Sequence, residues 1–503
     1  MYQLYRDRPI LLLCMIIANI VLSIWCLSID PVINNDGVTY LGIAELMLDG
    51  QWSEAFNYYS WPYYSAFIAA TAKVTFLEIE TAAHFLNITL VCSLTLAFVC
   101  IVGELSNNNQ RIMLIAALVI LFFPSITKYR SFIIRDFGYL SCYLWCLYFV
   151  FRFCSTLNKH HLIGWILFAI LSCLFRIEGI AFLLIASYFL VLFTSQKMPH
   201  RKLVLSSLSI GLVVLSALLL LLYVKDKYAP MIQVAQAAGK DINNIFELFL
   251  ANTQNQLGNK EITMFNFGMV IVNNIGTVFY ELVRRMAVFY FLFAIYAYYY
   301  NIGFKSSLIK RVWLVYVISN LCILIVFSLY NNFLASRYTM ASALTLLLLA
   351  PFVIDQLLNA FKDYRISKKC ISVFALTLLC LTSIEGLNVW TKKNHIKEAG
   401  LWVQNSLDAD ATIYSNDPLI PYYAGRSAKT TMDDNYSSLK LGHYIETSHL
   451  ESFDYVALST KPKDIFENLV NQQFLKNYGS PINVINGREN RNVFVYKISE
   501  TRL

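Results

Sequence analysis

Residues 9–40, PILLLCMIIANIVLSIWCLSIDPVINNDGVTY, decide the fold of this chain, because a long apolar run there gives way to a short polar segment. The apolar part has roughly the 20-residue length that crosses a bilayer as a helix. Arg6 and Arg8 precede it, as in a signal peptide, but residues 28–31 offer no small-x-small cleavage site and further apolar runs follow. The sequence therefore predicts a retained membrane helix with Asp36 held at the membrane surface after it.

Composition extends this prediction to most of the chain. The 503 residues are 57% hydrophobic and 14% charged, and the mean hydropathy is +0.53. Many separate apolar runs in such a chain are typical of a polytopic α-helical membrane protein. Roughly eleven spans are expected, at about 9–29, 82–103, 112–126, 137–154, 162–175, 177–195, 203–224, 283–302, 312–330, 338–358 and 370–388.

Lysine and arginine are concentrated in alternate loops, as the positive-inside rule expects when the N-terminus is cytoplasmic. The cytoplasmic cations are Arg6, Arg8, Arg111, Arg152, Lys159, Lys197, Arg201, Lys202, Lys305, Lys310, Arg311, Lys362, Arg365, Lys368 and Lys369. The opposite side receives 30–81, 127–136, 225–282, 331–337 and everything after about 389. This topology accounts for much of the net charge of +8, so the charge does not indicate nucleic-acid binding.

The tail after residue 388 differs in character from the rest of the chain. Its apolar runs shorten to strand length, with amphipathic stretches between them. The strand-like runs are 411–415, 455–459 and 493–497, and the amphipathic stretches are about 393–406 and 463–474. We predict a transmembrane domain over 1–388, with its first external loop at 30–81, and a small water-soluble α/β domain over 389–503.

The cysteines and histidines indicate neither a disulfide framework nor a protein-built zinc site. All 11 cysteines lie in or beside predicted spans, and no CxxC pair with metal spacing occurs. The pair His160-His161 is read as solvated. The absence of loop disulfides and the compact size fit a bacterial inner membrane better than the endoplasmic reticulum.

Charged residues on the non-cytoplasmic side form the candidate site. They are Asp36, Lys128, Arg130, Arg135, Asp136, Arg176, Glu178 and Arg337. Each cation alone is also explained as a snorkelling side chain or a span-end anchor. Together they run against the positive-inside bias, and a phosphate ester or anionic headgroup would compensate them through charge-assisted hydrogen bonds. The cluster predicts a phosphate site at the membrane surface.

Several short motifs carry a family resemblance. They are Asp36-Gly-Val-Thr-Tyr40, Ala44-Glu-Leu, Asp49-Gly50, Trp61-Pro62-Tyr63-Tyr64 and Arg135-Asp136 before the fourth span. With the many spans, Arg337-Tyr338 at a late span and the soluble tail, the chain resembles polyprenyl-phosphate-dependent glycosyltransferases of the GT-C superfamily. The bacterial aminoarabinose-transferase and protein-mannosyltransferase group is the most similar.

The resemblance implies an inverting transfer of a sugar from a polyprenyl phosphate to a lipid, polysaccharide or protein acceptor outside the cytoplasm. The first-loop acid of the family maps onto Asp36 and the second-loop acid onto Asp136. Many members have a second acid after the first, where this chain has Gly37, and no DxD motif is present. No cofactor is assigned, and a divalent metal stays open.

The chemistry assigns a role to each candidate. A carboxylate can accept the proton of the attacking hydroxyl, which we expect of Asp36. Cations stabilise the leaving phosphate, with Arg135, Arg337 and Lys128 ahead of Arg130 and Arg176. For three residues a second interpretation stays open: Glu178 orients Arg176, Asp136 holds Arg135, and Tyr40 either touches substrate or packs in the core.

Two other functions remain as alternatives. A lipid or glycolipid flippase would also use many spans and intramembrane charges, together with repeats or polar residues deep in several helices. No internal repeat is obvious, and the charges gather at one face. A scaffold protein would use the tail as its working part and would tolerate replacement of Asp36.

Overall fold

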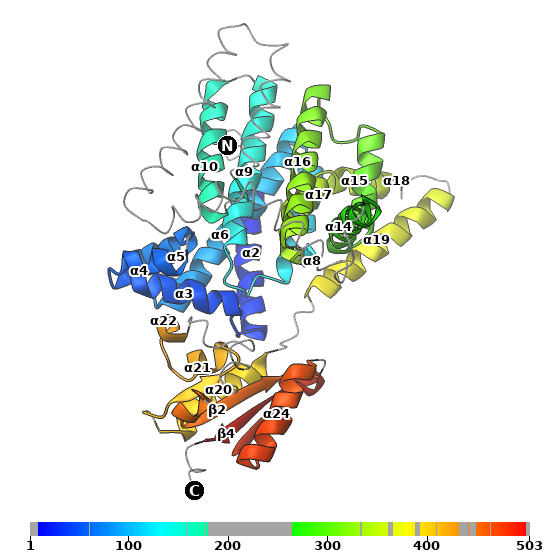
Figure 1. Cartoon of the computed structure of the whole chain (residues 1–503). Helices are drawn as coiled ribbons and strands as arrows, with labels where there is room; N and C mark the ends of the chain where they lie inside the picture. The colour runs from blue at the N-terminus through cyan, green and yellow to red at the C-terminus, as the bar shows by residue number, and fades with distance from the viewer. Residues whose placement is uncertain are drawn as a thin grey trace. The chain divides into compact units, whose positions relative to one another are not determined.

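The computed structural model describes residues 9–59, 61–156, 158–176, 178–179, 264–331, 334–360, 366–387, 393–408, 410–431, 441, 449–462 and 464–498. These residues are mostly helical and belong to two compact units (Figure 1). Unit 1 comprises 1–22, 88–129 and 135–388, and unit 2 comprises 23–87, 130–134 and 389–503. Each unit therefore combines segments that are far apart in the sequence. The predicted span 203–224 lies outside the described residues, as does 177–195 except for residues 178 and 179.

Unit 1 is built from helices. Those that lie wholly or partly in it are α2 (Pro9–Ile29), α6 (Ile79–Leu105), α7 (Gln110–Leu121), α8 (Pro124–Thr127), α9 (Asp136–Thr156), α10 (Lys159–Phe175), α14 (Met264–Arg285), α15 (Phe289–Tyr299), α16 (Ser307–Asn331), η1 (Ser336–Thr339), α17 (Met340–Leu347), α18 (Ala350–Ala360) and α19 (Ile366–Leu387). Within the described part of the chain, α2, α6, α9 and most of α16 are long and apolar enough to cross a membrane. The pair formed by Ser336–Leu347 and α18 passes the same test with a bend of 49°.

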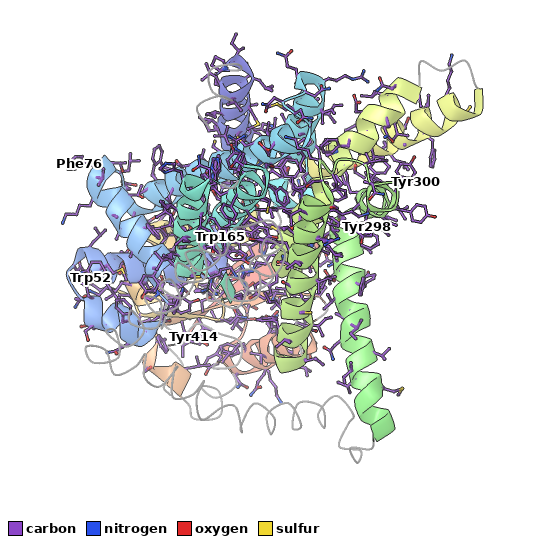
Figure 2. All side chains as sticks on the ribbon, turned by 90° about the horizontal axis from the view of Figure 1, so that it is seen from above. Trp52, Phe76, Trp165, Tyr298, Tyr300 and Tyr414 are labelled. Carbon is purple, nitrogen blue, oxygen red and sulfur yellow. The ribbon has the colours of Figure 1, made fainter. Side chains whose placement is uncertain are left out.

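The outward faces of these helices carry large apolar side chains. On α2, Ile10, Leu13, Ile17 and Val21 are exposed at helical spacing. In unit 2, Phe76, labelled in Figure 2 directly after α5 (Tyr63–Thr75), is also 93% exposed. Exposed apolar surface of this extent is unfavourable in water and is satisfied by lipid. The multi-pass membrane architecture predicted from composition is thus consistent with the surface.

Three predicted spans differ from the observed helices. The span expected at 283–302 is broken, because α14 ends at Arg285 and α15 begins only at Phe289. The span expected at 112–126 ends as α7 at Leu121, where Pro124 starts the separate turn α8 and cannot donate a backbone hydrogen bond to the preceding turn. The third, at 338–358, is the bent pair, with its break after Leu347.

Unit 2 joins the first external loop to the tail. Its loop helices are α3 (Asn35–Leu48), α4 (Trp52–Tyr58) and α5, all within the loop predicted at 30–81. Its tail elements are α20 (Asn394–Ser406), β1 (Ile413–Ser415), α21 (Leu419–Tyr423), α22 (Ala428–Thr431), η2 (His449–Ser452), β2 (Tyr455–Thr460), α24 (Ile465–Tyr478), β3 (Asn483–Asn486), η3 (Arg488–Asn490) and β4 (Asn492–Lys497). Strand β3 was not predicted, because it has only four residues and is polar at both ends.

The tail strands form a four-stranded sheet of order β1-β2-β4-β3, in which β1 and β2 are parallel and the other pairs antiparallel. Helix α24 covers one face, where Val456, Leu458 and Tyr496 form a core with Phe474 (Figure 1). Helix α20 contacts β3 and β4. Side chains alternate between the two faces of a strand. Because helices contact the sheet, consecutive residues such as Val456, Ala457 and Leu458 are all buried.

Candidate active site

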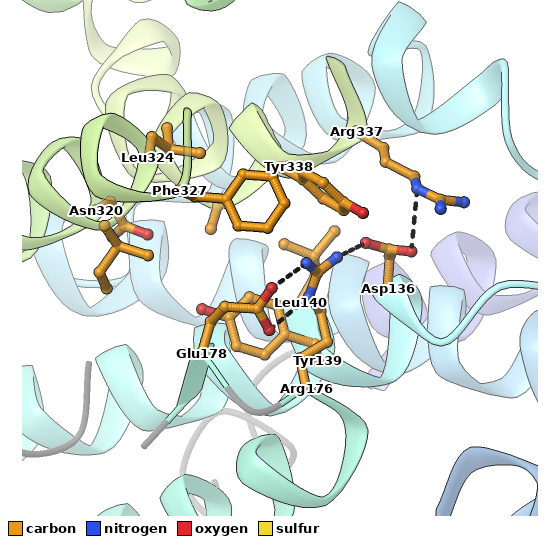
Figure 3. Close-up of a pocket in the computed structure, with 12 residues that line it drawn as sticks. Asp136, Tyr139, Leu140, Arg176, Glu178, Asn320, Leu324, Phe327, Arg337 and Tyr338 are labelled. Carbon is orange, nitrogen blue, oxygen red and sulfur yellow. Dashed lines mark hydrogen bonds and ion pairs between the residues drawn. The ribbon is translucent and has the colours of Figure 1, made fainter. Parts of the chain in front are cut away.

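A buried ion cluster joins the start of α9 to the end of α10. These two helices are consecutive, and only a short turn separates them, so they pack side by side and the first residue of one lies near the last residue of the other. Asp136 opens α9, and Arg176 directly follows α10. Arg176 donates hydrogen bonds to Oδ1 of Asp136 and to both carboxylate oxygens of Glu178 (Figure 3).

Gly138 allows this approach of the two helix ends. A Cβ atom built on Gly138 would lie only 2.2 Å from the ring of Phe175, so any other residue would displace that ring. The pair that results is deeply buried, since the side chains of Asp136 and Arg176 are each 6% exposed. Burial of this kind requires that each charge be paired, and the shared guanidinium meets that need.

Residues from η1 complete one wall of the pocket above this cluster. The guanidinium of Arg176 lies 4.4 Å from the ring centre of Tyr338, and Nε of Arg337 lies 4.0 Å from Oδ2 of Asp136. The other residues in the lining of this pocket, which we call the acidic pocket, are Tyr139, Leu140, Glu178, Asn320, Ile323, Leu324, Phe327 and Ala341. Aromatic and aliphatic side chains thus surround two cations and two carboxylates.

Arg337 also lines a second pocket, which we call the basic pocket. Its lining comprises Tyr129, Glu281, Arg284, Leu334, Ala335, Ser336 and Arg337. At its edge Arg285 donates a hydrogen bond to Ser336 and lies 5.9 Å from the ring centre of Tyr129, with Nζ of Lys128 5.6 Å from the same ring. Four cations therefore stand around this pocket against one acid, Glu281.

Neither Arg130 nor Arg135, the other predicted phosphate ligands, lines the acidic or the basic pocket. Arg130 belongs to unit 2, is 2% exposed, and donates to Oγ of Ser23 at 3.0 Å. Arg135 belongs to unit 1 and interacts electrostatically with Glu178. The prediction missed Arg284 and Arg285, because both were placed at the start of the span 283–302. The signal that could have found them is a pair of arginines at the end of an amphipathic stretch.

Asp36 lies in unit 2, in the first turn of α3, where a carboxylate interacts favourably with the helix dipole. The packing of Asn34 and Ile133 around Gly37 explains why this chain lacks the second acid that many family members have at that position. A Cβ atom on Gly37 would lie 3.1 Å from Oδ1 of Asn34 and 3.3 Å from Cβ of Ile133. Oδ1 of Asn34 meanwhile accepts a hydrogen bond from the Ile133 amide at 2.8 Å. Close packing against Asn34 and the 130–134 segment thus disfavours a side chain at the place of a second acid.

Tyr40 is buried in an aromatic cluster. Its ring makes edge contacts with Tyr64 at 5.0 Å and with Tyr59 at 6.3 Å between ring centres. The Tyr64 hydroxyl donates to Asn87, whose amide donates in turn to the carbonyl of Phe132 at 2.7 Å. Of the two interpretations given for Tyr40, these contacts favour packing over a role in substrate contact.

Comparison with solved structures gives the fold. The crystal structure of an oligosaccharyltransferase from Archaeoglobus fulgidus, in complex with Zn and sulfate, matches with a TM-score of 0.54 at 12% identity over 88% of this chain and 68% of that one. This chain has a GT-C fold. The same protein tethered to an acceptor peptide matches with a TM-score of 0.46 at 12% identity, over 90% of this chain and 69% of that one. No protein-family model and no curated protein sequence matches. The resemblance to the aminoarabinose-transferase and protein-mannosyltransferase group stays a prediction.

The carboxylates of the acidic pocket do not fit a metal ion. Asp136 and Glu178 both bind the guanidinium of Arg176, which takes the position between them that a shared cation would need. In the described part of the chain, no group of three His, Cys, Asp or Glu residues is placed to hold a metal. We therefore derive no step of the reaction through a metal.

Removal of Arg176 should destabilise the protein strongly. Arg176→Met would leave two carboxylates buried without their shared cation, which typically costs about 3–5 kcal/mol. We expect a large fall in the thermal unfolding midpoint in detergent, and partial recovery in Arg176→Met/Glu178→Gln. Arg284→Met is the matched control, because Arg284 pairs with Glu281 at 2.7 Å but its side chain is 52% exposed, so about 1 kcal/mol or less is expected. Equal losses for the two arginines would contradict this account.

Gly37→Ala should lower stability, because the added methyl group must displace Asn34 or Ile133, at a cost of about 1–3 kcal/mol. Gly276→Ala is the control. Gly276 lies inside α14 with no atom within 4 Å of a built Cβ, so alanine there should be neutral or stabilising by about 0.5–1 kcal/mol. Both variants can be compared by thermal unfolding. A neutral Gly37→Ala would refute the packing explanation.

Proposed function

We propose that this protein is an integral-membrane glycosyltransferase that moves a sugar from a polyprenyl-phosphate donor to a lipid, polysaccharide or protein acceptor on the non-cytoplasmic face. The proposal rests on the GT-C fold together with one observation about the site. Arg337 lines both the acidic pocket and the basic pocket. A side chain in that place can contact a donor phosphate held among the cations, and its Nε lies 4.0 Å from Oδ2 of Asp136 in the buried ion cluster.

The basic pocket suits the phosphate of the donor. Arg337 and Arg284 line it, and Arg285 and Lys128 stand at its edge over the ring of Tyr129. Guanidinium groups bind phosphate oxygens through paired, charge-assisted hydrogen bonds. The exposed apolar helix faces provide the lipid contact that a polyprenyl chain needs.

The reaction forms one bond and breaks another. The acceptor hydroxyl oxygen attacks the anomeric carbon, and the carboxylate of Asp36 takes the hydroxyl proton. The bond from the anomeric carbon to the phosphate oxygen breaks, and the polyprenyl phosphate leaves with the electron pair. Its charge grows in that step, so cations preorganised in the basic pocket stabilise the transition state more than the ground state. Attack on the face opposite the leaving phosphate inverts the anomeric configuration.

Asp136 acts in this proposal as a positioning residue. Its Oδ1 is bound by Arg176, and its Oδ2 faces Nε of Arg337 at 4.0 Å. The buried Arg176 fixes Asp136, and Asp136 orients Arg337 toward the basic pocket. Glu178 fixes Arg176 from the other side. Neither carboxylate needs to touch the sugar.

Asp36→Asn should abolish most transfer, since loss of a general base typically lowers the rate by about 10²–10⁴. The measurement is incorporation of radiolabelled sugar from the cell's own polyprenyl-phosphate-sugar pool into total glycolipid and protein, at matched membrane expression. Asp49→Asn is the control, because Asp49 is an exposed acid of the same loop that pairs with Lys429 at 3.1 Å. Equal incorporation by Asp36→Asn and wild type would remove Asp36 from catalysis. Absence of incorporation in the wild type would favour transport or a scaffold role.

Arg337→Gln should weaken both donor binding and transition-state stabilisation. Loss of hydrogen bonds to a charged group costs about 1.5–3 kcal/mol, which corresponds to a fall of about 10–100-fold in kcat/KM for the donor. Arg111→Gln is the control, since Arg111 pairs with Asp355 and lines neither pocket. Steady-state kinetics with varied donor tests this. Unchanged kcat/KM would exclude Arg337 from the phosphate site.

A further inference from the structure

The short segment that leads to Asp36 has no regular structure of its own. It comprises residues 30–34, between the end of α2 and the start of α3. Asn34 stands at the position that usually caps the helix, but its side chain makes no capping hydrogen bond and binds the Ile133 amide instead. The place of Asp36 therefore depends on what holds this segment from outside.

Tyr423 and Lys393 of the tail supply three contacts to this segment and to the first residue of α3, all within unit 2. The hydroxyl oxygen of Tyr423, the last residue of α21, accepts the amide hydrogen of Ile33 at 2.9 Å. The same hydroxyl donates to the carbonyl of Pro31 at 3.4 Å. Nζ of Lys393 donates to Oδ1 of Asn35 at 2.7 Å, on the residue directly before Asp36. These bonds hold the segment at Pro31 and Ile33 and also hold Asn35.

Close packing of α20 on α21 brings these groups together. A Cβ atom on Gly400 would lie 2.6 Å from Cβ of Tyr423 and 2.7 Å from the carbonyl oxygen of Ile420, so only glycine permits the approach. Lys397, on the same helix as Gly400, places Nζ 4.9 Å from the Tyr423 ring centre and donates to the Pro31 carbonyl at 3.3 Å. The anchor is a built part of unit 2.

We infer that Tyr423 and Lys393 are positioning residues for Asp36, so that the C-terminal tail is a component of the catalytic apparatus rather than an appended module. This inference rests on the proposed function. A general base works only when it is held within about 0.5 Å of its productive place, and a misplacement of about 1 Å can cost about 100-fold in rate. The Ile33 amide is also nearly inaccessible, so loss of its acceptor leaves a buried donor unsatisfied.

Adjacent tyrosines provide a matched test in the full-length protein. Tyr423→Phe removes the hydroxyl that holds Ile33 and keeps the ring. Tyr422→Phe removes a hydroxyl from the same helix that donates to Glu80 and does not bind the 30–34 segment. We expect Tyr423→Phe to lower kcat about 10-fold, with the donor KM within about twofold of wild type, and Tyr422→Phe to keep the wild-type kcat. Thermal unfolding of each variant checks that a fall in kcat does not come from a loss of folded protein.

Hydrogen exchange gives a readout that does not depend on activity. In Tyr423→Phe, peptides that cover residues 30–40 should exchange faster because the Ile33 amide loses its acceptor, whereas Tyr422→Phe should leave them unchanged. Lys393→Met should also lower kcat while leaving the Ile33 exchange close to that of wild type.

Three outcomes overturn the inference. The first is wild-type kcat and exchange in Tyr423→Phe. The second is an equal loss of kcat in both tyrosine variants, which would indicate a general attachment of the tail. The third is full activity of Asp36→Asn, which overturns the base assignment and the positioning role together. If Asp36→Asn is inactive and Tyr423→Phe is fully active, the positioning role alone is overturned.

Discussion

Two carboxylates in unit 1, Asp136 and Glu178, share one buried guanidinium, and the geometry of the candidate site depends on this sharing. The cost of removing three charges from water is offset only when their hydrogen bonds are satisfied together. Arg176 achieves this with a bidentate bond to one acid and a bond to the other. The cluster locks the start of α9 to the end of α10 and presents the remaining oxygen of Asp136 to Arg337.

Buried backbone groups in unit 2 also need hydrogen-bond partners. Two of its segments, 30–34 and 130–134, lack regular structure, so their buried amide and carbonyl groups need partners from elsewhere. Side chains from distant positions provide them: Asn34 binds Ile133, Asn87 binds Phe132, and Tyr423 binds Ile33. Each of these residues ties together parts of the chain that are remote in sequence. The path of the chain near Asp36 is consequently set by tertiary contacts.

The sequence predicted those features that are carried by local patterns. Long apolar runs located α2, α6, α9 and α16, and short apolar runs located β1, β2 and β4. The breaks at Ala287 and Leu348 left no such trace, because apolar residues continue through both. The pairing of Glu178 with Arg176 was one of the interpretations given, but the link from Arg176 to Asp136 escaped prediction for a related reason. Asp136 was expected beside its neighbour Arg135, whereas its observed partner Arg176 is 40 residues away and becomes adjacent only through the α9–α10 hairpin.

Tertiary contacts also distinguish arginines that the sequence did not distinguish. Arg130, Arg176 and Arg337 were all predicted to bind phosphate, yet the first two are almost wholly buried, while the side chain of Arg337 is 25% exposed. A guanidinium that is already enclosed by Asp136, Glu178 and the ring of Tyr338 would have to break those contacts before binding a ligand. Arg337 lines two pockets. Burial and existing partners therefore distinguish Arg176, which is enclosed in the ion cluster, from Arg337, which we propose as the phosphate ligand, a difference that no count of positive charges reveals.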